Sequence, residues 1–263
     1  MAYYSGKVAS KNLYSTLIGH IAAVQPGESL AWWKKESSLD SDGVYTSTGS
    51  SGSERIVLVF RENTIGSSIT VGTAKDYTPG VINTAGAFDQ LRVQNMVYYT
   101  SAQADSVEVS YDINITKDRI IIHLQGDKLI AAWQNPVLYI GMPIKYDVND
   151  RRCVVLAISE NPVSHAGGLY VLQDANNVPN PVYTWHHVNS PGNPSWGNSA
   201  FLEVLHFGYG LEGLRGEFEG LYVTNPLNMV DGTEVDVTGT RFKTIVSKGA
   251  GNFPRATFLL KMS

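Results

Sequence analysis

Hydrophobic and polar residues alternate most regularly between Val107 and Thr116. The apolar positions are Val107, Val109, Tyr111, Ile113 and Ile115, and the polar ones are Glu108, Ser110, Asp112, Asn114 and Thr116. This alternation predicts a β-strand with one apolar and one polar face. Lys117-Asp118 then predicts a tight turn, and Arg119 to Leu124 the returning strand of an antiparallel hairpin.

Other apolar runs predict further strands. Ile56 to Phe60 has no polar interruption, which is typical of a buried strand, and Ile69 to Val71 indicates a shorter one. Near the C-terminus, Glu234 to Thr238 and Arg241 to Val246 flank Gly239, a residue that tolerates positive φ, so a second hairpin is expected. The final TFLLKM is predicted to join the same sheet.

One segment has helical periodicity. Between Asn12 and Val24, apolar residues recur every three or four positions, and Pro26-Gly27 provides a stop signal. From Glu36 to Ser53, Ser, Thr, Gly and Asp are in excess, which predicts a mobile loop.

The predicted fold is therefore mainly β, with antiparallel sandwich or barrel-like sheets, one principal N-terminal helix and long loops. We divide the chain into an N-terminal assembly region, residues 1–105, and a β-rich domain, residues 106–263.

Composition supports short strands joined by turns, because 25 of the 263 residues are glycine and only 17% are charged. A net charge of −4 argues against direct binding of nucleic acid or of an anionic membrane surface. The single cysteine, Cys153, cannot form an internal disulfide and indicates folding in a reducing compartment. The N-terminus has no apolar signal segment, so we expect synthesis as a soluble cytosolic protein.

Motifs for enzyme chemistry are incomplete. Gly208 to Gly213 matches GxGxxG, but the strand-like Leu221-Tyr222-Val223 follows where a phosphate-binding helix would have to begin. His186 and His187 are adjacent, so on a strand they point to opposite faces and cannot chelate one ion. No nucleophile, base and orienting group can be assembled. We therefore expect no catalytic activity, no cofactor and no metal.

Aromatic residues offer three interpretations: ordinary core, a sugar-binding groove or protein–protein anchors. A sugar groove would use Trp185, Trp196 and Tyr209 as stacking platforms. Trp32 and Trp33 would face opposite sides of a strand, so one of them is expected to contact a neighbouring chain. The predicted interface residues are Trp32, Trp33, Arg215, Glu217, Phe218, Glu219, Leu221 and Tyr222.

Three segments, DRIIIHLQGD from Asp118, WQNPVLYIGMP from Trp133 and GLRGEFEGLYVTNP from Gly213 with the following DGTEVDV, resemble virion structural proteins of tailed bacteriophages. The resemblance covers a little over half of the chain, from Asp118 onward. It implies a β-rich tail, baseplate or neck subunit that is made in the host cytoplasm, has no catalytic residues and becomes part of the virion. Its partners would be copies of itself in a ring or trimer and other virion proteins, without direct nucleic acid or membrane contact. A carbohydrate- or receptor-binding module of a phage fibre or decoration protein is the alternative.

Overall fold

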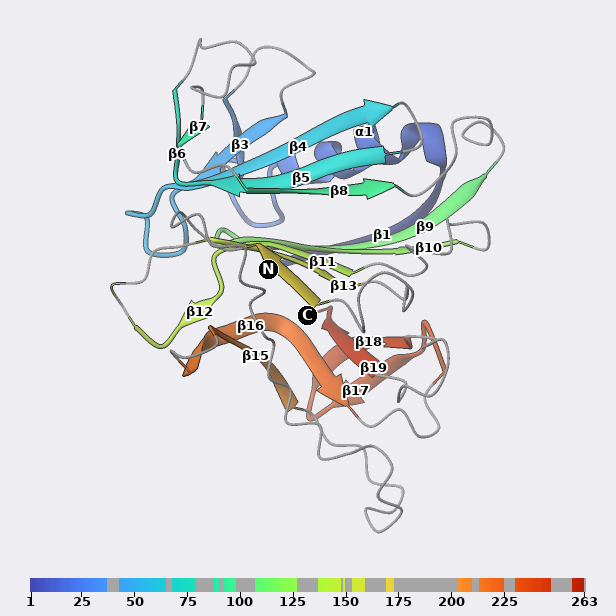
Figure 1. The fold of residues 1–263 in the computed structure, drawn as a ribbon. Coiled ribbons are helices and arrows are strands. Elements are labelled where there is room, and N and C mark those ends of the chain that lie inside the picture. The colour runs from blue at the N-terminus through green and yellow to red at the C-terminus, as the bar shows by residue number, and fades with distance from the viewer. Residues whose placement is uncertain are drawn as a thin grey trace.

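Three antiparallel sheets are stacked on one another, with a helix beside the upper two layers (Figure 1). The computed structural model describes residues 1–36, 43–64, 68–78, 88–89, 92–97, 107–126, 137–147, 149, 153–158, 169–172, 203–209, 213–224, 230–246 and 257–262. We call the layers the N-terminal, middle and C-terminal sheets. The predicted β-dominated fold class is confirmed.

The N-terminal sheet has the strand order β2 (Lys34–Lys35), β3 (Val44–Ser47), β4 (Ile56–Thr64), β5 (Ser68–Ala74), β8 (Arg92–Val97). A separate ribbon pairs β6 (Asp76–Tyr77) with β7 (Phe88–Asp89). All five residues from Ile56 to Phe60 are buried, which confirms the predicted strand. The predicted loop from Glu36 to Ser53 is wrong at β3, where Val44 and Tyr45 are buried because they pair with β4.

The predicted helix is confirmed as α1 (Ser10–Ala22), which begins and ends two residues earlier than the pattern indicated. Its buried side chains include Leu13, Leu17 and Ile21, whose spacing places them on one face. This face packs between the N-terminal and middle sheets, and α1 contacts both β1 (Ala2–Ala9) and β9 (Glu108–Ile115).

The middle sheet has the order β1, β9, β10 (Arg119–Gln125), β11 (Val137–Gly141), β13 (Val154–Ile158), β14 (Leu169–Leu172). The predicted hairpin of β9 and β10 is confirmed, with Ile115 opposite Ile120. β1 pairs with β9 along its whole length, from Ala2 opposite Ile115 to Ala9 opposite Glu108. A boundary at residue 105 therefore does not separate two cores, because strands from both sides of it form one sheet.

The C-terminal sheet has the order β12 (Ile144–Lys145), β16 (Gly213–Thr224), β19 (Thr257–Lys261), β18 (Thr240–Val246), β17 (Glu234–Val237), and β15 (Glu203–Tyr209) also pairs with β16. The second predicted hairpin is confirmed, since Val237 lies opposite Thr240. Its two turn residues, Thr238 and Gly239, have φ values of 52° and 85°. The closing strand β19 joins the same sheet, as predicted.

Both faces of the middle sheet are covered. Ile120, Ile122 and Leu124 of β10 pack toward α1 and the N-terminal sheet, whereas Ile121 packs against Phe218, Leu221 and other apolar residues of the C-terminal sheet. The polar face of β9 is covered as well, with Asp112 and Asn114 at most 2% exposed. Alternation alone identified this face as polar but did not reveal that another sheet covers it.

Asp112 is the centre of a buried polar cluster between the middle and C-terminal sheets. Its carboxylate accepts hydrogen bonds from the Tyr3 hydroxyl at 2.5 Å, from Lys243 Nζ at 2.8 Å and from His123 Nδ1 at 3.0 Å. Burial by itself raises the pKa of Asp112, but the hydrogen bond and charge of His123, together with the hydrogen bonds from Lys243 and Tyr3, outweigh it and lower the pKa. The buried carboxylate is therefore ionised and links strands of two sheets.

The Asp112 cluster predicts acid sensitivity. Because the folded-state pKa lies below the ordinary value of 3.8, Asp112 stabilises the fold fully above about pH 4, and this contribution is lost as pH falls through the lower folded-state pKa. Asp112→Asn should lower the free energy of unfolding at pH 7 by about 3 kcal/mol or more, since it leaves Lys243 without its charged partner. When urea unfolding is measured between pH 7 and pH 2, the free energy of unfolding of Asp112→Asn should fall less steeply with pH than that of the wild type.

Asp236→Asn is the matched control, because it removes an exposed carboxylate from the β17–β18 turn without touching the buried cluster. Its stability at pH 7 should stay within about 0.5 kcal/mol of the wild type. If the free energy of unfolding falls equally steeply toward low pH in the wild type and in Asp112→Asn, the role assigned to Asp112 is contradicted.

Candidate interaction surface

Buried residues alternate with more exposed ones along the first half of strand β16. Gly216, Phe218 and Gly220 are buried, whereas the side chains of Arg215, Glu217 and Glu219 alternate with them. Arg215 and Glu217 are half-buried and Glu219 is exposed. The charged residues that the sequence singled out therefore share one side of this strand.

Strand β16 curves strongly along its length (Figure 1), and its pairing with β15 is irregular between Glu217 and Tyr222. Val204 of β15 lies opposite Tyr222, but His206, only two positions later, lies opposite Glu217, so β16 carries extra residues at the bend. Gly220 has a φ of +85°, and a Cβ there would lie 2.4 Å from Arg119 Nη2. Glycine is required both for the backbone conformation and for the close approach of Arg119.

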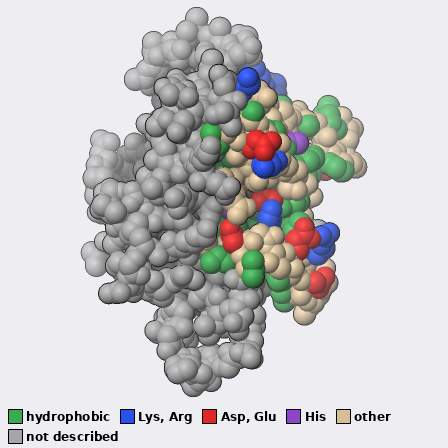
Figure 2. Space-filling view, turned by 90° about the vertical axis from the view of Figure 1, so that its right-hand side faces the viewer, with side chains coloured by type: hydrophobic (Ala, Val, Ile, Leu, Met, Phe, Trp, Pro, Cys, Tyr) green, Lys and Arg blue, Asp and Glu red, His purple; other side chains and the backbone are tan. Residues whose placement is uncertain are grey.

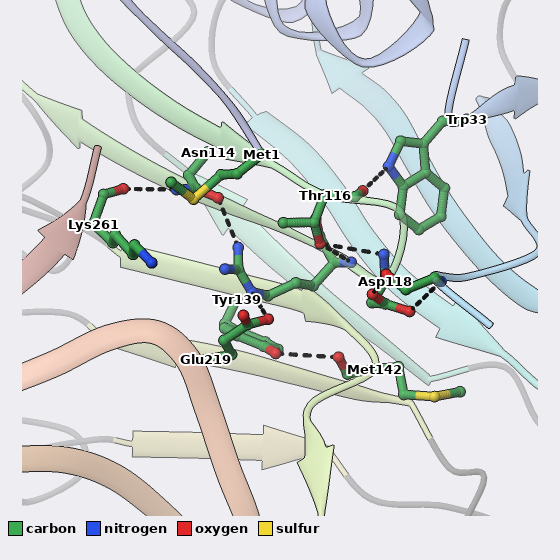
Figure 3. A network of polar contacts seen from close by, with 11 residues as sticks. Met1, Trp33, Asn114, Thr116, Asp118, Tyr139, Met142, Glu219 and Lys261 are labelled. Carbon is green, nitrogen blue, oxygen red and sulfur yellow. Dashed lines mark hydrogen bonds and ion pairs between the residues drawn. The ribbon is translucent and has the colours of Figure 1, made fainter. Parts of the chain in front are cut away.

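Arg119 lies against Gly220 and joins the two sheets through Asn114 and Glu219, both of which are labelled in Figure 3. Its side chain is 1% exposed, and its Nη1 donates a hydrogen bond of 2.7 Å to Asn114 Oδ1. Asn114 Nδ2 in turn donates to the backbone carbonyl of Lys261 on β19. Arg119 Nε lies 3.6 Å from Glu219 Oε2, and the guanidinium carbon is 5.8 Å from the centre of the Tyr139 ring. A buried cation of the middle sheet thus positions an exposed carboxylate of β16.

Strand β12 adds apolar residues beside this strip. Ile144 pairs with Glu217, and Tyr146 donates from its backbone NH to Arg215 O and from its hydroxyl to Glu217 Oε1, at 2.8 Å. Ile144 and Tyr146 are 46% and 49% exposed. Burial, together with the hydrogen bond to Glu217, raises the pKa of Tyr146 to about 12, so its hydroxyl remains a donor at neutral pH.

We define the β12–β16 surface as Ile144, Tyr146, Arg215, Glu217 and Glu219. Sequence reasoning identified the three charged residues but missed Ile144 and Tyr146. These two lie in or just after a two-residue strand, which is too short to show periodicity. Only its pairing with β16 reveals their position.

Three of the predicted interface residues belong to the core. Trp33 is 1% exposed and its Nε1 donates to the backbone carbonyl of Thr116 at 2.8 Å, while Phe218 and Leu221 pack between the middle and C-terminal sheets. Their side chains have no surface left for a partner, which corrects the prediction for these three. β16 is covered on the face that carries Phe218, so its apolar side chains stabilise the fold instead.

Trp32 and Tyr222 are only partly buried, so their predicted roles at an interface stay predictions. Trp32 packs against the cluster between the N-terminal and middle sheets, whereas Tyr222 makes an edge-to-face contact with Phe242 of the C-terminal sheet. The two residues lie on opposite sides of the middle sheet. Trp32 is therefore not part of the β12–β16 surface.

The predicted sugar-stacking residues are not tested by the structure. Trp185 and Trp196 lie outside the described residues, and for Tyr209 only the backbone at the end of β15 is described. His186 and His187 also lie outside them. The GxGxxG sequence spans the connection between β15 and β16, which are antiparallel, and a strand rather than a helix follows it.

Three further results bear on function. The described residues contain no group of three or more His, Cys, Asp or Glu side chains arranged to hold a metal ion. Within the same part of the chain, no helix has the length and apolar character needed to cross a membrane. The chain matches no protein-family model and no curated protein sequence.

The geometry at Gly220 yields a stability prediction. Gly220→Ala should lower the free energy of unfolding by about 2 kcal/mol or more, because it adds a clash with Arg119 to the cost of a left-handed alanine. Gly239→Ala is the matched control, since Gly239 has the same φ of +85° but a Cβ there would have no atom within 4 Å. Chemical denaturation of both variants should show a clearly larger loss for Gly220→Ala, and equal losses would contradict the role of the Arg119 contact.

Proposed function

We propose that this protein is a structural subunit of a tailed-phage virion and acts through protein–protein assembly. The observation that carries the proposal is the β12–β16 surface, where exposed Ile144 and Tyr146 lie beside charged groups of both signs. Protein interfaces typically combine an apolar or aromatic centre with a polar rim. The resemblance of the segments from Asp118 onward to virion proteins indicates the kind of assembly.

The way in which this surface is held by the fold supports the same proposal. Its residues lie on or directly beside paired strands, and Arg119 holds Glu219 from below with a side chain that is itself almost completely buried. A preformed surface loses little conformational freedom on binding. Glu217 and Glu219 beside Arg215 form a mixed-charge row that would orient a partner, and Tyr146 would contribute contact area.

The proposed partners are copies of the same chain in a ring or trimer and other virion structural proteins, in the virion after synthesis in the host cytoplasm. The net charge of −4 provides no strong attraction for nucleic acid. Figure 2 shows the side of the molecule that lies at the right of Figure 1, where acidic and basic side chains are interspersed with apolar ones over the described residues. This mixture favours a protein partner over a polyanion.

The direct test of this function is quantitative mass spectrometry of purified particles. The protein should be present in them at a fixed copy number relative to the other structural proteins. Its absence from particles, with abundant free protein in infected cells, would overturn the proposal. Binding of the free protein to a glycan array would then favour the carbohydrate-binding alternative.

The β12–β16 surface can be tested by substitution. Ile144→Ser with Tyr146→Ser should weaken incorporation or self-association by about 2 kcal/mol, because two exposed side chains of the apolar centre are lost. Sedimentation velocity and particle copy number would measure the effect, and an unchanged melting temperature would show that the fold is retained.

Val230→Ser is the matched control, because Val230 is 69% exposed outside the β12–β16 surface. It should leave assembly unchanged. Tyr146→Phe separates the contribution of the aromatic ring from that of the hydroxyl, since it keeps the ring and loses only the hydrogen bond to Glu217. If the double serine variant enters particles at the normal copy number, the β12–β16 surface is not the contact.

A further inference from the structure

Strand β1 forms one margin of the middle sheet. It pairs with β9 through eight consecutive residues without a register shift and contains no proline. None of the described strands pairs with its other side. Edge strands of this length and regularity can accept another strand through backbone hydrogen bonds.

The register shows which backbone groups are directed outward. Ser10 N donates to Val107 O at 2.8 Å, so this opposed pair is a hydrogen-bonded one. Bonded and non-bonded pairs alternate along an antiparallel ladder, and the even-numbered residues of β1 therefore bond to β9. The NH and CO groups that point away from β9 belong to Tyr3, Ser5, Lys7 and Ala9.

We propose that β1 is a self-association surface, on which the β1 strand of a second copy pairs antiparallel across a two-fold axis at Gly6. In this register, Tyr3 lies opposite Ala9 of the second copy and Ser5 opposite Lys7, so all four outward-directed residues take part. Lys7 meets a neutral serine instead of another lysine, and its charge is balanced by Glu108 at 2.6 Å. The strand sequence is thus complementary to itself, which is what a two-fold contact requires.

Helix α1 fits the same arrangement. It packs on both β1 and β9, so its axis lies over these two strands. With strands about 4.8 Å apart, the helices of two paired copies would be about 10 Å apart, which is a normal helix packing distance. The exposed side of α1 includes Ser15, Gly19 and Ala22, and no atom lies within 4 Å of a Cβ placed at Gly19. Small residues at these positions would let a second helix approach.

This contact is separate from the β12–β16 surface. A ring closed through β12–β16 and a two-fold contact through β1 are compatible, because they combine to dihedral symmetry when the two-fold axes are perpendicular to the ring axis. Self-association through β1 can therefore be disproved while the proposed function holds, and the proposed function can be disproved while self-association through β1 holds.

Ser5→Pro tests the edge directly. It removes an NH that points away from β9, so the β1–β9 ladder keeps its hydrogen bonds while the contact between the two copies loses two, one from each Ser5. Sedimentation equilibrium of the full chain should show a wild-type dimer, and Ser5→Pro should raise its dissociation constant at least about tenfold with little change in circular dichroism. Ser5→Thr, which keeps the NH, is the matched control and should dimerise like the wild type.

A charge exchange tests the register and does not depend on proline. Ser5→Lys should weaken the dimer, because it opposes Lys7 of the second copy, and adding Lys7→Glu in the same chain should restore it. If the two-fold axis were at residue 5, the lysines introduced at position 5 of the two copies would lie opposite each other in both variants. Adding Lys7→Glu would then not restore the dimer. A wild type that stays monomeric at high concentration, or a dimer unaffected by both Ser5→Pro and Ser5→Lys, would overturn the inference.

Discussion

The structure depends on the burial of a polar sheet face between two layers. Asp112, Asn114, Arg119 and His123 project from the middle sheet toward the C-terminal sheet and are almost inaccessible to solvent. Buried charges of this kind are tolerated only when they are paired and hydrogen-bonded. Lys243 on the C-terminal sheet pairs with Asp112, and the carbonyl of Lys261 on the same sheet accepts a hydrogen bond from Asn114. The docking of this sheet is therefore specified by polar complementarity as well as by apolar contact.

The same buried groups shape the surface above them. Arg119 fills the space at Gly220 that a side chain would otherwise occupy, and the bend of β16 forms around it. The bend separates Glu217 and Glu219, which alternate with buried residues, from Leu221, which is itself buried. A core interaction thereby determines which residues of one strand are available to a partner. In the proposed role as an assembly subunit, this would couple the stability of the fold to the shape of the contact surface.

The two proposed contacts differ in kind. Side chains dominate the β12–β16 surface, where specificity would come from shape and charge. Backbone groups dominate the β1 edge, where affinity would come from hydrogen bonds that depend little on side-chain identity. β1 and β12 lie at margins of different sheets in the stack, so the two contacts need not compete. A protein with both could build an extended assembly from one type of chain.

Local patterns in the sequence determined the helix and the strands with the clearest apolar patterns. The alternation in β9, the apolar run in β4 and the spacing in α1 are local signals, since each depends on residues within one element. The hairpins were predictable for the same reason, because short turns bring neighbouring strands together.

Contacts between residues distant in the sequence decided the rest. β1 pairs with a strand about one hundred positions away, across the expected division at residue 105. β3 formed in a polar segment because β4 provided a partner. The same holds for Trp33, Phe218 and Leu221, whose chemistry suits an interface or a core equally well. The side chains of these residues are apolar in any fold, but only the packing of the layers determines whether another part of the chain or another molecule covers them.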